Sequence, residues 1–153
     1  MRHSFYKEAL LLSNHPNYRI AVEIIIVHDG KILLTKRAED AQVGPGAWCV
    51  PSGKVKYEER PIEALYREAL EETNLEVEFI AELDQRTFKG KSTIEDIYRL
   101  VFTYLVKPKF DRIDRFAINE EHSEYAWVTK KELSDPKFGT LHPTLMRLLE
   151  EAF

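Results

Sequence analysis

The sequence predicts a single α/β domain, because strand-type and helix-type patterns alternate along a chain of ordinary domain length. The chain has 153 residues, and 44% of them are hydrophobic, which is enough for one core. Residues 19–28 are almost continuously apolar and rich in β-branched side chains, which predicts a strand buried on both faces. Residues 62–73 contain no Gly or Pro and many strong helix formers, which predicts a helix.

Further strands are predicted on both sides of this helix. Asp29 and Gly30 form a two-residue hairpin signal, so the strand before them should return directly after the turn. Gly44-Pro45-Gly46 marks a turn in the loop that follows. The predicted strands are 19–28, 31–36, 47–51, 75–83 and 94–106, with a polar turn region at 84–93.

Helices are also predicted near both ends of the chain. Residues 1–17 are expected to be an N-terminal extension in which residues 4–13 form a short helix. Thr129 should cap a helix over residues 129–133. The last helix is expected within residues 144–153, where an apolar stripe has helical spacing: Leu145, Leu148 and Leu149.

The central helix carries an unusual cluster of acidic residues. At about 100° per residue, one continuous arc of its surface is apolar and is predicted to be buried. Three glutamates lie on the arc beside it, at i, i+3 and i+4, where like charges repel. Oxygen ligands of this kind suit Mg²⁺ or Mn²⁺, so the cluster predicts a divalent metal site. The apolar arc is Ile62, Leu65, Tyr66, Ala69 and Leu70, and the glutamates are Glu68, Glu71 and Glu72.

The stretch GKVKYEERPIEALYREALEETNL, residues 53–75, resembles the Nudix box, which reads G-x5-E-x7-R-E-U-x-E-E-x-G-U with U aliphatic. The sequence departs from that pattern at Ala69 and at Asn74, which replaces a glycine and can still adopt the left-handed conformation that ends a helix. No charged position of the box is changed. The matching residues are Gly53, Glu59, Arg67, Glu68, Glu71, Glu72 and Leu75.

This resemblance implies an α/β/α sandwich with a mixed β-sheet, formed as one Nudix domain over residues 1–153. It also implies a Nudix pyrophosphohydrolase that uses Mg²⁺ or Mn²⁺ to hydrolyse a pyrophosphate bond in a nucleoside diphosphate derivative, either a nucleotide or an NDP-sugar. The implied metal ligands are Glu68, Glu71, Glu72 and the carbonyl of Gly53. Arg67 is expected to orient Glu68, and Glu59 to support the loop or the outer metal shell.

Residues after the box add candidates for the site. The segment over residues 116–128, with Glu120, Glu121, Tyr125 and Trp127, resembles the E-x-x-Y-x-W region of the family, in which a loop acid approaches the metal. Glu120 is therefore a further expected metal ligand. Glu68 is the preferred general base, with Glu120, Glu121 and His122 as rivals. Lys36 and Arg37, at the end of the second strand, either bind the substrate's phosphates or form a solvated strand end.

Two other functions stay open at this stage. The first is a Nudix-fold sensor that binds a nucleotide without cutting it. The second is an isoprenoid-diphosphate isomerase, for which Cys49 is the only available cysteine. The net charge of −4 argues against a broad nucleic-acid surface. We expect no signal peptide, no membrane span and a cytoplasmic location, and a homodimer is compatible with the sequence.

Overall fold

The computed structural model describes residues 18–90 and 97–152. The predicted N-terminal extension, with its helix at residues 4–13, lies outside the described residues, as does the predicted start of a strand at 94–96. The proposed extent of the single domain, 1–153, stays a prediction.

A mixed sheet forms the centre of the molecule, with strands in the order β3-β2-β1-β6-β5, β4 pairing with β1, and β7 with β2. The β1–β6 pair is parallel, and the other pairs are antiparallel. The strands are β1 (Tyr18–His28), β2 (Lys31–Arg37), β3 (Trp48–Cys49), β4 (Ser52–Lys54), β5 (Val77–Gly90), β6 (Ile97–Pro108) and β7 (His122–Val128). The helices are α2 (Pro61–Thr73), α3 (Pro143–Glu151) and the 3-10 turns η1 (Lys109–Asp111), η2 (Lys130–Ser134) and η3 (Pro136–Phe138).

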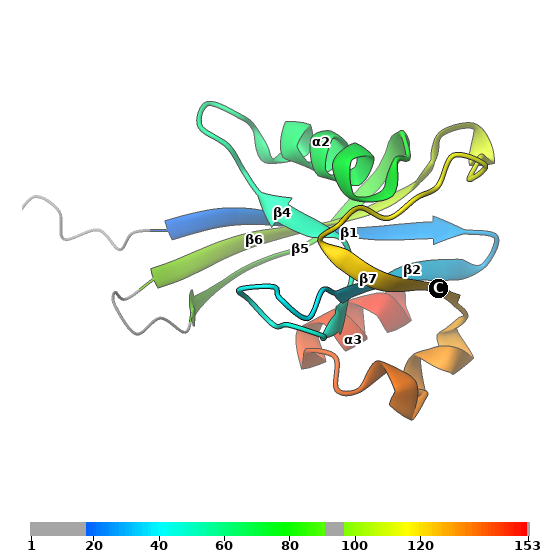
Figure 1. Ribbon diagram of the computed structural model, residues 1–153. Helices are drawn as coiled ribbons and strands as arrows, with labels where there is room; N and C mark the ends of the chain where they lie inside the picture. Colours follow the sequence, from blue (N-terminus) through cyan, green and yellow to red (C-terminus); the bar gives the residue numbers. More distant parts are fainter. Residues whose placement is uncertain (1–17, 91–96, 153) are drawn as a thin grey trace, which may run out of the picture.

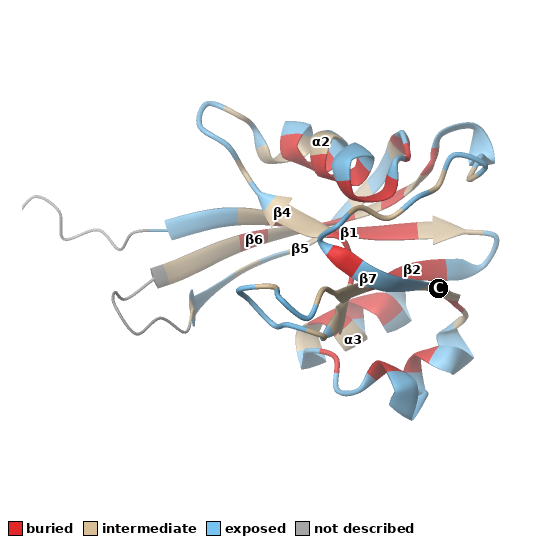
Figure 2. Ribbon diagram, viewed as in Figure 1, coloured by how far each residue is buried: buried red, intermediate tan, exposed pale blue. Residues whose placement is uncertain are grey.

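The two α-helices lie on opposite sides of the sheet, which gives three layers (Figure 1). Successive residues of β1 point to opposite faces of the sheet and therefore pack in two different hydrophobic cores. Val22 and Ile24 pack in the core under α2, whereas Ile25 packs in the core against α3. The middle of the sheet is accordingly buried on both faces (Figure 2). The predicted α/β/α sandwich with a mixed sheet is confirmed.

The local signals in the first half of the chain predicted its elements correctly. Asp29 has φ 49° and Gly30 has φ 70°, the left-handed conformations that a tight hairpin turn requires. The central helix ends at Asn74, which has φ 54° and donates its N–H to the carbonyl of Leu70 at 2.9 Å. Asn74 thus replaces the glycine of the box without loss of the left-handed cap.

The predicted polar turn at residues 84–93 is wrong for its first part. Strand β5 continues to Gly90 and pairs with β6 along its length. The register shifts between Phe79 and Ala81 and again between Glu82 and Asp84. These bulges obscure the alternation of side chains that would have marked a long strand, and they let the backbone hydrogen bonds resume beyond each shift. The strand expected at 47–51 is shorter, since β3 covers only Trp48–Cys49, and a further strand, β4, begins at Ser52.

The buried face of α2 differs from the predicted apolar arc. Leu65 and Ala69 are fully buried, but Tyr66 and Leu70 are 42% and 48% exposed. Glu68 and Glu72 are buried instead, at 8% and 1% exposure. The helix packs on β1 and β4, and this docking turns its acidic side toward the sheet. Two charged side chains have therefore been brought into the protein where helix periodicity placed only apolar ones.

The C-terminal part follows the predicted order with one change of helix type. Thr129 precedes η2, which is a 3-10 helix, and its N–H donates to Oε2 of Glu132 at 2.7 Å. The predicted apolar stripe of the last helix is buried against the sheet: Leu145, Leu148 and Leu149.

Within residues 18–90 and 97–152, no helix has the length and apolar character needed to cross a membrane.

Candidate active site

An open cleft of about 580 Å³ lies where β4 and the buried side of α2 meet. Its walls carry both signs of charge. Five of the lining residues are Arg or Lys and three are Glu, so the cleft can attract an anion and also supply carboxylate ligands. The lining residues are Ala21, Arg37, Val43, Ser52, Gly53, Lys54, Lys56, Arg67, Glu68, Glu71, Arg99 and Glu121.

Arg67 connects the acidic residues of the box. Its Nε and Nη2 donate to both carboxylate oxygens of Glu59, at 2.7 and 2.9 Å. Its Nη1 donates to Glu68 at 2.6 Å and to Glu71 at 3.2 Å, and Nη2 also reaches the carbonyl of Lys54 at 2.8 Å. The two-pronged hydrogen bond thus goes to Glu59, while Glu68 receives a single short one. One guanidinium fixes the loop before the helix to the helix itself.

Glu59 should contribute to acid stability through this contact. The Arg67 hydrogen bond and then the Lys56 N–H lower the pKa of Glu59 to about 2. A carboxyl with a depressed folded-state pKa stabilises the protein above its unfolded pKa, and that contribution is lost as the pH falls. We expect Glu59→Gln to lower the free energy of unfolding at pH 7 and to reduce its decline between about pH 4.5 and 2. Urea unfolding at several pH values measures both, and Glu58→Gln is the control; equal acid dependence of both variants would contradict the assignment.

Gly53 is packed directly against Glu68. A Cβ added to Gly53 would lie 1.9 Å from Cδ of Glu68 and 2.2 and 2.3 Å from its carboxylate oxygens. No side chain can be accommodated there unless Glu68 moves. The glycine therefore lets the Glu68 carboxylate lie against the backbone of β4.

Glu72 is the most buried of the three box glutamates. The N–H of Ser52 donates to its Oε2 at 3.2 Å, and Nε2 of His122 lies 3.8 Å from the same oxygen. Burial, followed by the negative charges of Glu68 and Glu121, raises the pKa of Glu72 to about 9. Burial and the nearby Arg37 lower the pKa of His122 to about 4. In the metal-free protein, both groups are therefore neutral near pH 7.

The donor set suits a hard divalent cation, although it is not yet gathered around one. In the part of the chain that the structure describes, no three His, Cys, Asp or Glu side chains form a ready metal site. Glu68 and Glu71 instead share the Arg67 guanidinium. Three carboxylates within two helical turns, one of them held in the protein with a raised pKa, are the oxygen ligands that Mg²⁺ and Mn²⁺ prefer. The residues therefore fit such an ion after rotation of Glu68 and Glu71 toward it.

In two pairs of sequence neighbours that were both candidates for the site, the structure places only one residue in the cleft lining. Arg37 lines the cleft and donates to Oγ of Ser52 at 3.4 Å. Lys36 does not line it and pairs with Glu39 and Glu124 at 3.9 and 4.0 Å. The register of β2 against β7 shifts between Lys36 and Arg37. In the loop before β7, Glu121 lines the cleft, whereas Glu120 does not.

Three cationic residues of the cleft were missed by sequence reasoning. Lys54 and Lys56 follow Gly53 inside the box stretch, and their alternation along the chain could have indicated a common side. Arg99 had no local signal. Strand β6 pairs in parallel with β1, so that Arg99 lies opposite Arg19 and Val101 lies opposite Ala21. This register brings Arg99 close to Ala21, and both residues line the cleft.

The sandwich carries a cleft with charges of both signs, which suits a small anionic ligand together with a divalent cation. The NUDIX domain family model matches residues 17–149. The nucleoside triphosphatase NudI of Escherichia coli K12 is 34% identical over 117 residues, which cover 71% of this chain and 80% of that protein. The NudI of Salmonella agona is 31% identical over 133 residues, covering 80% of this chain and 92% of that protein. The chain belongs to the Nudix family and is a MutT-like Nudix pyrophosphohydrolase.

Solved structures agree with this assignment. The MutT protein of Methanosarcina mazei Go1 superimposes with a TM-score of 0.69 at 26% identity, covering 92% of this chain and 96% of that one. The solution structure of the E. coli ORF135 protein gives a TM-score of 0.63 at 26% identity, with 88% of each chain covered. Nudix hydrolases generally use divalent metal ions, and the family acts on small nucleotide-type molecules.

Proposed function

We propose that this protein hydrolyses a pyrophosphate bond of a nucleoside triphosphate with Mg²⁺ as the preferred ion. The observation that carries the proposal is the cleft in which Glu68 and Glu71 of the box lie with four cationic residues: Arg37, Lys54, Lys56 and Arg99. A triphosphate is long enough to meet both sets of charges, and the NudI relatives are described as nucleoside triphosphatases. An NDP-sugar offers fewer phosphate charges and is the second candidate.

The proposed metal ligands are Glu68, Glu71 and Glu72 with the carbonyl of Gly53. When bound, the ion would offset the phosphate charge and acidify a coordinated water. Arg37 binds the phosphates from the opposite wall, since its guanidinium is held at the cleft by Ser52. Arg67 and Glu59 keep the loop and Glu68 in position. Glu121 replaces Glu120 as the proposed loop acid, because only Glu121 lines the cleft.

Glu68 remains the proposed general base, with Glu121 as its rival. Burial raises the pKa of Glu68, which makes its carboxylate a better proton acceptor than an exposed one. His122 is 8% exposed, does not line the cleft and has a pKa lowered to about 4, so it is not proposed as the base. Cys49 also lies outside the cleft lining, which removes the support for an isomerase.

A substrate panel tests this proposal. Purified protein is incubated with ribo- and deoxynucleoside triphosphates, NDP-sugars and dinucleoside polyphosphates, each with Mg²⁺, Mn²⁺ or chelator. We expect at least one triphosphate to be hydrolysed with the highest kcat/KM, and the activity to be lost with chelator. Preferred turnover of an NDP-sugar would exclude the triphosphate assignment. Tight nucleotide binding without turnover across the panel would instead support a sensor.

The expected homodimer and cytoplasmic location stay predictions.

A further inference from the structure

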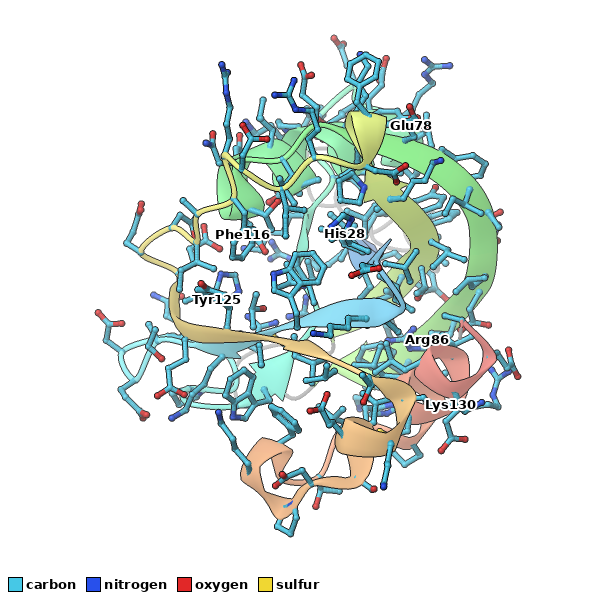
Figure 3. The ribbon with its side chains drawn as sticks, turned by 90° about the vertical axis from the view of Figure 1, so that its right-hand side faces the viewer. His28, Glu78, Arg86, Phe116, Tyr125 and Lys130 are labelled. Atoms are coloured by element: carbon cyan, nitrogen blue, oxygen red, sulfur yellow. The ribbon has the colours of Figure 1, made fainter. Side chains whose placement is uncertain are left out.

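An ion pair between Glu23 and Arg86 interrupts the apolar face of the sheet that α3 covers. Glu23 shares its face of β1 with the fully buried Ile25, which packs in the core against α3. Arg86 donates through Nη2 to Oε1 of Glu23 and through Nη1 to Oγ1 of Thr103 at 3.1 Å. Figure 3 shows Arg86 on the α3 side of the sheet. The Glu23 and Arg86 side chains are only 15% and 17% exposed, so this charge pair is largely removed from water.

The hydrogen bonding of this cluster is incomplete. Among the described residues, three of its buried atoms have no hydrogen-bond partner: Oε2 of Glu23, Oδ2 of Asp84 and Nε of Arg86. Unpaired buried polar atoms are costly, and an apolar pair of similar size is often as stable as a buried ion pair. Stability alone therefore does not account for these residues. Oε2 of Glu23 and Nε of Arg86 thus make no hydrogen bond, and neither does Oδ2 of Asp84, which lies 3.7 Å from Nη1 of Arg86.

The cluster lies beside the cleft on the same sheet, and its ion pair is not itself part of the cleft lining. Glu23 pairs with Ser52 across the β1–β4 ladder, and Ala21, two residues before Glu23, is on the same face. Both Ser52 and Ala21 line the cleft. On the other strands, Phe88 pairs with Arg99, a further lining residue, and Phe88 is two residues from Arg86. Strand register therefore places the ion pair next to cleft residues on both sides.

An aromatic surface lies beside the ion pair. The Phe88 ring is 43% exposed, and the guanidinium carbon of Arg86 lies 6.0 Å from its centre. A flat ring and an ordered guanidinium plane both favour a flat heterocycle placed against them. The three atoms without a hydrogen bond are buried, but the side chains that carry them are 15–22% exposed. Recognition of a ring bound there would require the two carboxylates to rotate toward it.

We propose that Glu23 and Arg86 read the base of the substrate and select nucleotides whose base carries an exocyclic amino group. This inference rests on the proposed nucleotide hydrolysis. Guanine, adenine and cytosine offer amino hydrogens next to an acceptor, which complements the free carboxylate oxygens and the Arg86 Nε. Thymine and uracil place two carbonyl oxygens around a single N–H and would bring them against the carboxylates. A site built on such hydrogen bonds discriminates strongly against bases that cannot form them.

The test is the paired variant Glu23→Leu/Arg86→Met, assayed with dGTP, dATP, dCTP, dTTP and dUTP in the presence of Mg²⁺. We expect wild type to prefer the amino-bearing bases and the variant to lose this preference by at least about tenfold, through KM rather than kcat. The matched control is Glu78→Leu/Lys107→Met. These residues form a cross-strand pair on β5 and β6, 3.6 Å apart, 43% exposed and outside the cleft lining, so the preference should be unchanged.

A single isosteric change gives a second, independent readout. Glu23→Gln keeps the size of the side chain but replaces an acceptor by a donor, so it should shift the kcat/KM ratio toward dTTP and dUTP. Equal base preference in wild type, or an unchanged ratio in both Glu23 variants, would overturn the inference while leaving nucleotide hydrolysis intact. Absence of hydrolysis of any nucleotide by wild type would instead reject the proposed function, and this assignment with it.

Discussion

Glu72→Gln should reduce kcat/KM by about a thousandfold while the protein remains folded. The charge stabilisation that a metal site supplies is several kcal/mol, and each 1.4 kcal/mol or so corresponds to a factor of ten in rate. Glutamine has the shape of the protonated glutamic acid that burial favours here, since the pKa of Glu72 is raised to about 9. The amide can keep the contact with the Ser52 N–H through its oxygen. Steady-state kinetics with Mg²⁺ measures the loss.

In the absence of metal, the same substitution should raise the free energy of unfolding, although it lowers the activity. A carboxyl whose folded-state pKa is raised favours folding most below its unfolded pKa, and this contribution is lost as the pH rises from about 4.5 through about 9. Without metal, Glu72→Gln should therefore be more stable than wild type at pH 8. With Mg²⁺, wild type should gain more in Tm than the variant, because ion binding stabilises the folded state. Glu150→Gln, at an exposed position of α3, is the control. Full activity in Glu72→Gln would remove Glu72 from the site.

Gly53→Ala should cost about a hundredfold in activity and about 1–3 kcal/mol in stability. The added Cβ would lie 1.9 Å from Cδ of Glu68, a distance that requires the carboxylate to move. Movement of Glu68 also breaks its 2.6 Å hydrogen bond with Arg67. A displacement of about 1 Å in a reacting or positioning group is sufficient for a loss of this size. Kinetics and urea unfolding measure the two effects.

The double variant Gly53→Ala/Glu68→Ala distinguishes the proposed cause from a general backbone effect. Glu68→Ala removes the side chain that the new methyl group meets. The stability cost of Gly53→Ala should then be largely relieved in the Glu68→Ala background, while activity stays low. Additive losses of stability would show that the Gly53 backbone, rather than its contact with Glu68, is responsible.

The acidic helix and the first hairpin could be predicted from the sequence because their signals are local. Asp29 and Gly30 adopt the conformations that a two-residue turn demands, whatever surrounds them. Spacing along α2 placed Glu68, Glu71 and Glu72 on adjoining positions. Helix periodicity could not decide which part of the apolar arc of α2 would be buried, because Leu65, Tyr66 and Leu70 all belong to it. Docking on β1 and β4 made that choice.

Strand pairing decided the parts of the cleft that come from distant segments. Arg37 and Lys36 are adjacent in sequence, and only the tertiary structure, in which the register of β2 against β7 shifts between them, places the first in the cleft lining and the second outside it. Arg99 and the ion pair of Glu23 with Arg86 come from three strands whose register no local pattern specifies. The bulges in β5 also interrupt the alternation of its side chains, so the polar second half of the strand could not be recognised from the sequence.

The sequence alone thus determined the box helix, its caps and the chemistry of its carboxylates, since these depend on spacings of a few residues. The tertiary structure decided how deeply each carboxylate is buried, which cations face it and how far the cleft extends along the sheet. Burial and long-range register arise only when the layers pack, and they set the raised pKa of Glu72 and the unpaired atoms beside Arg86.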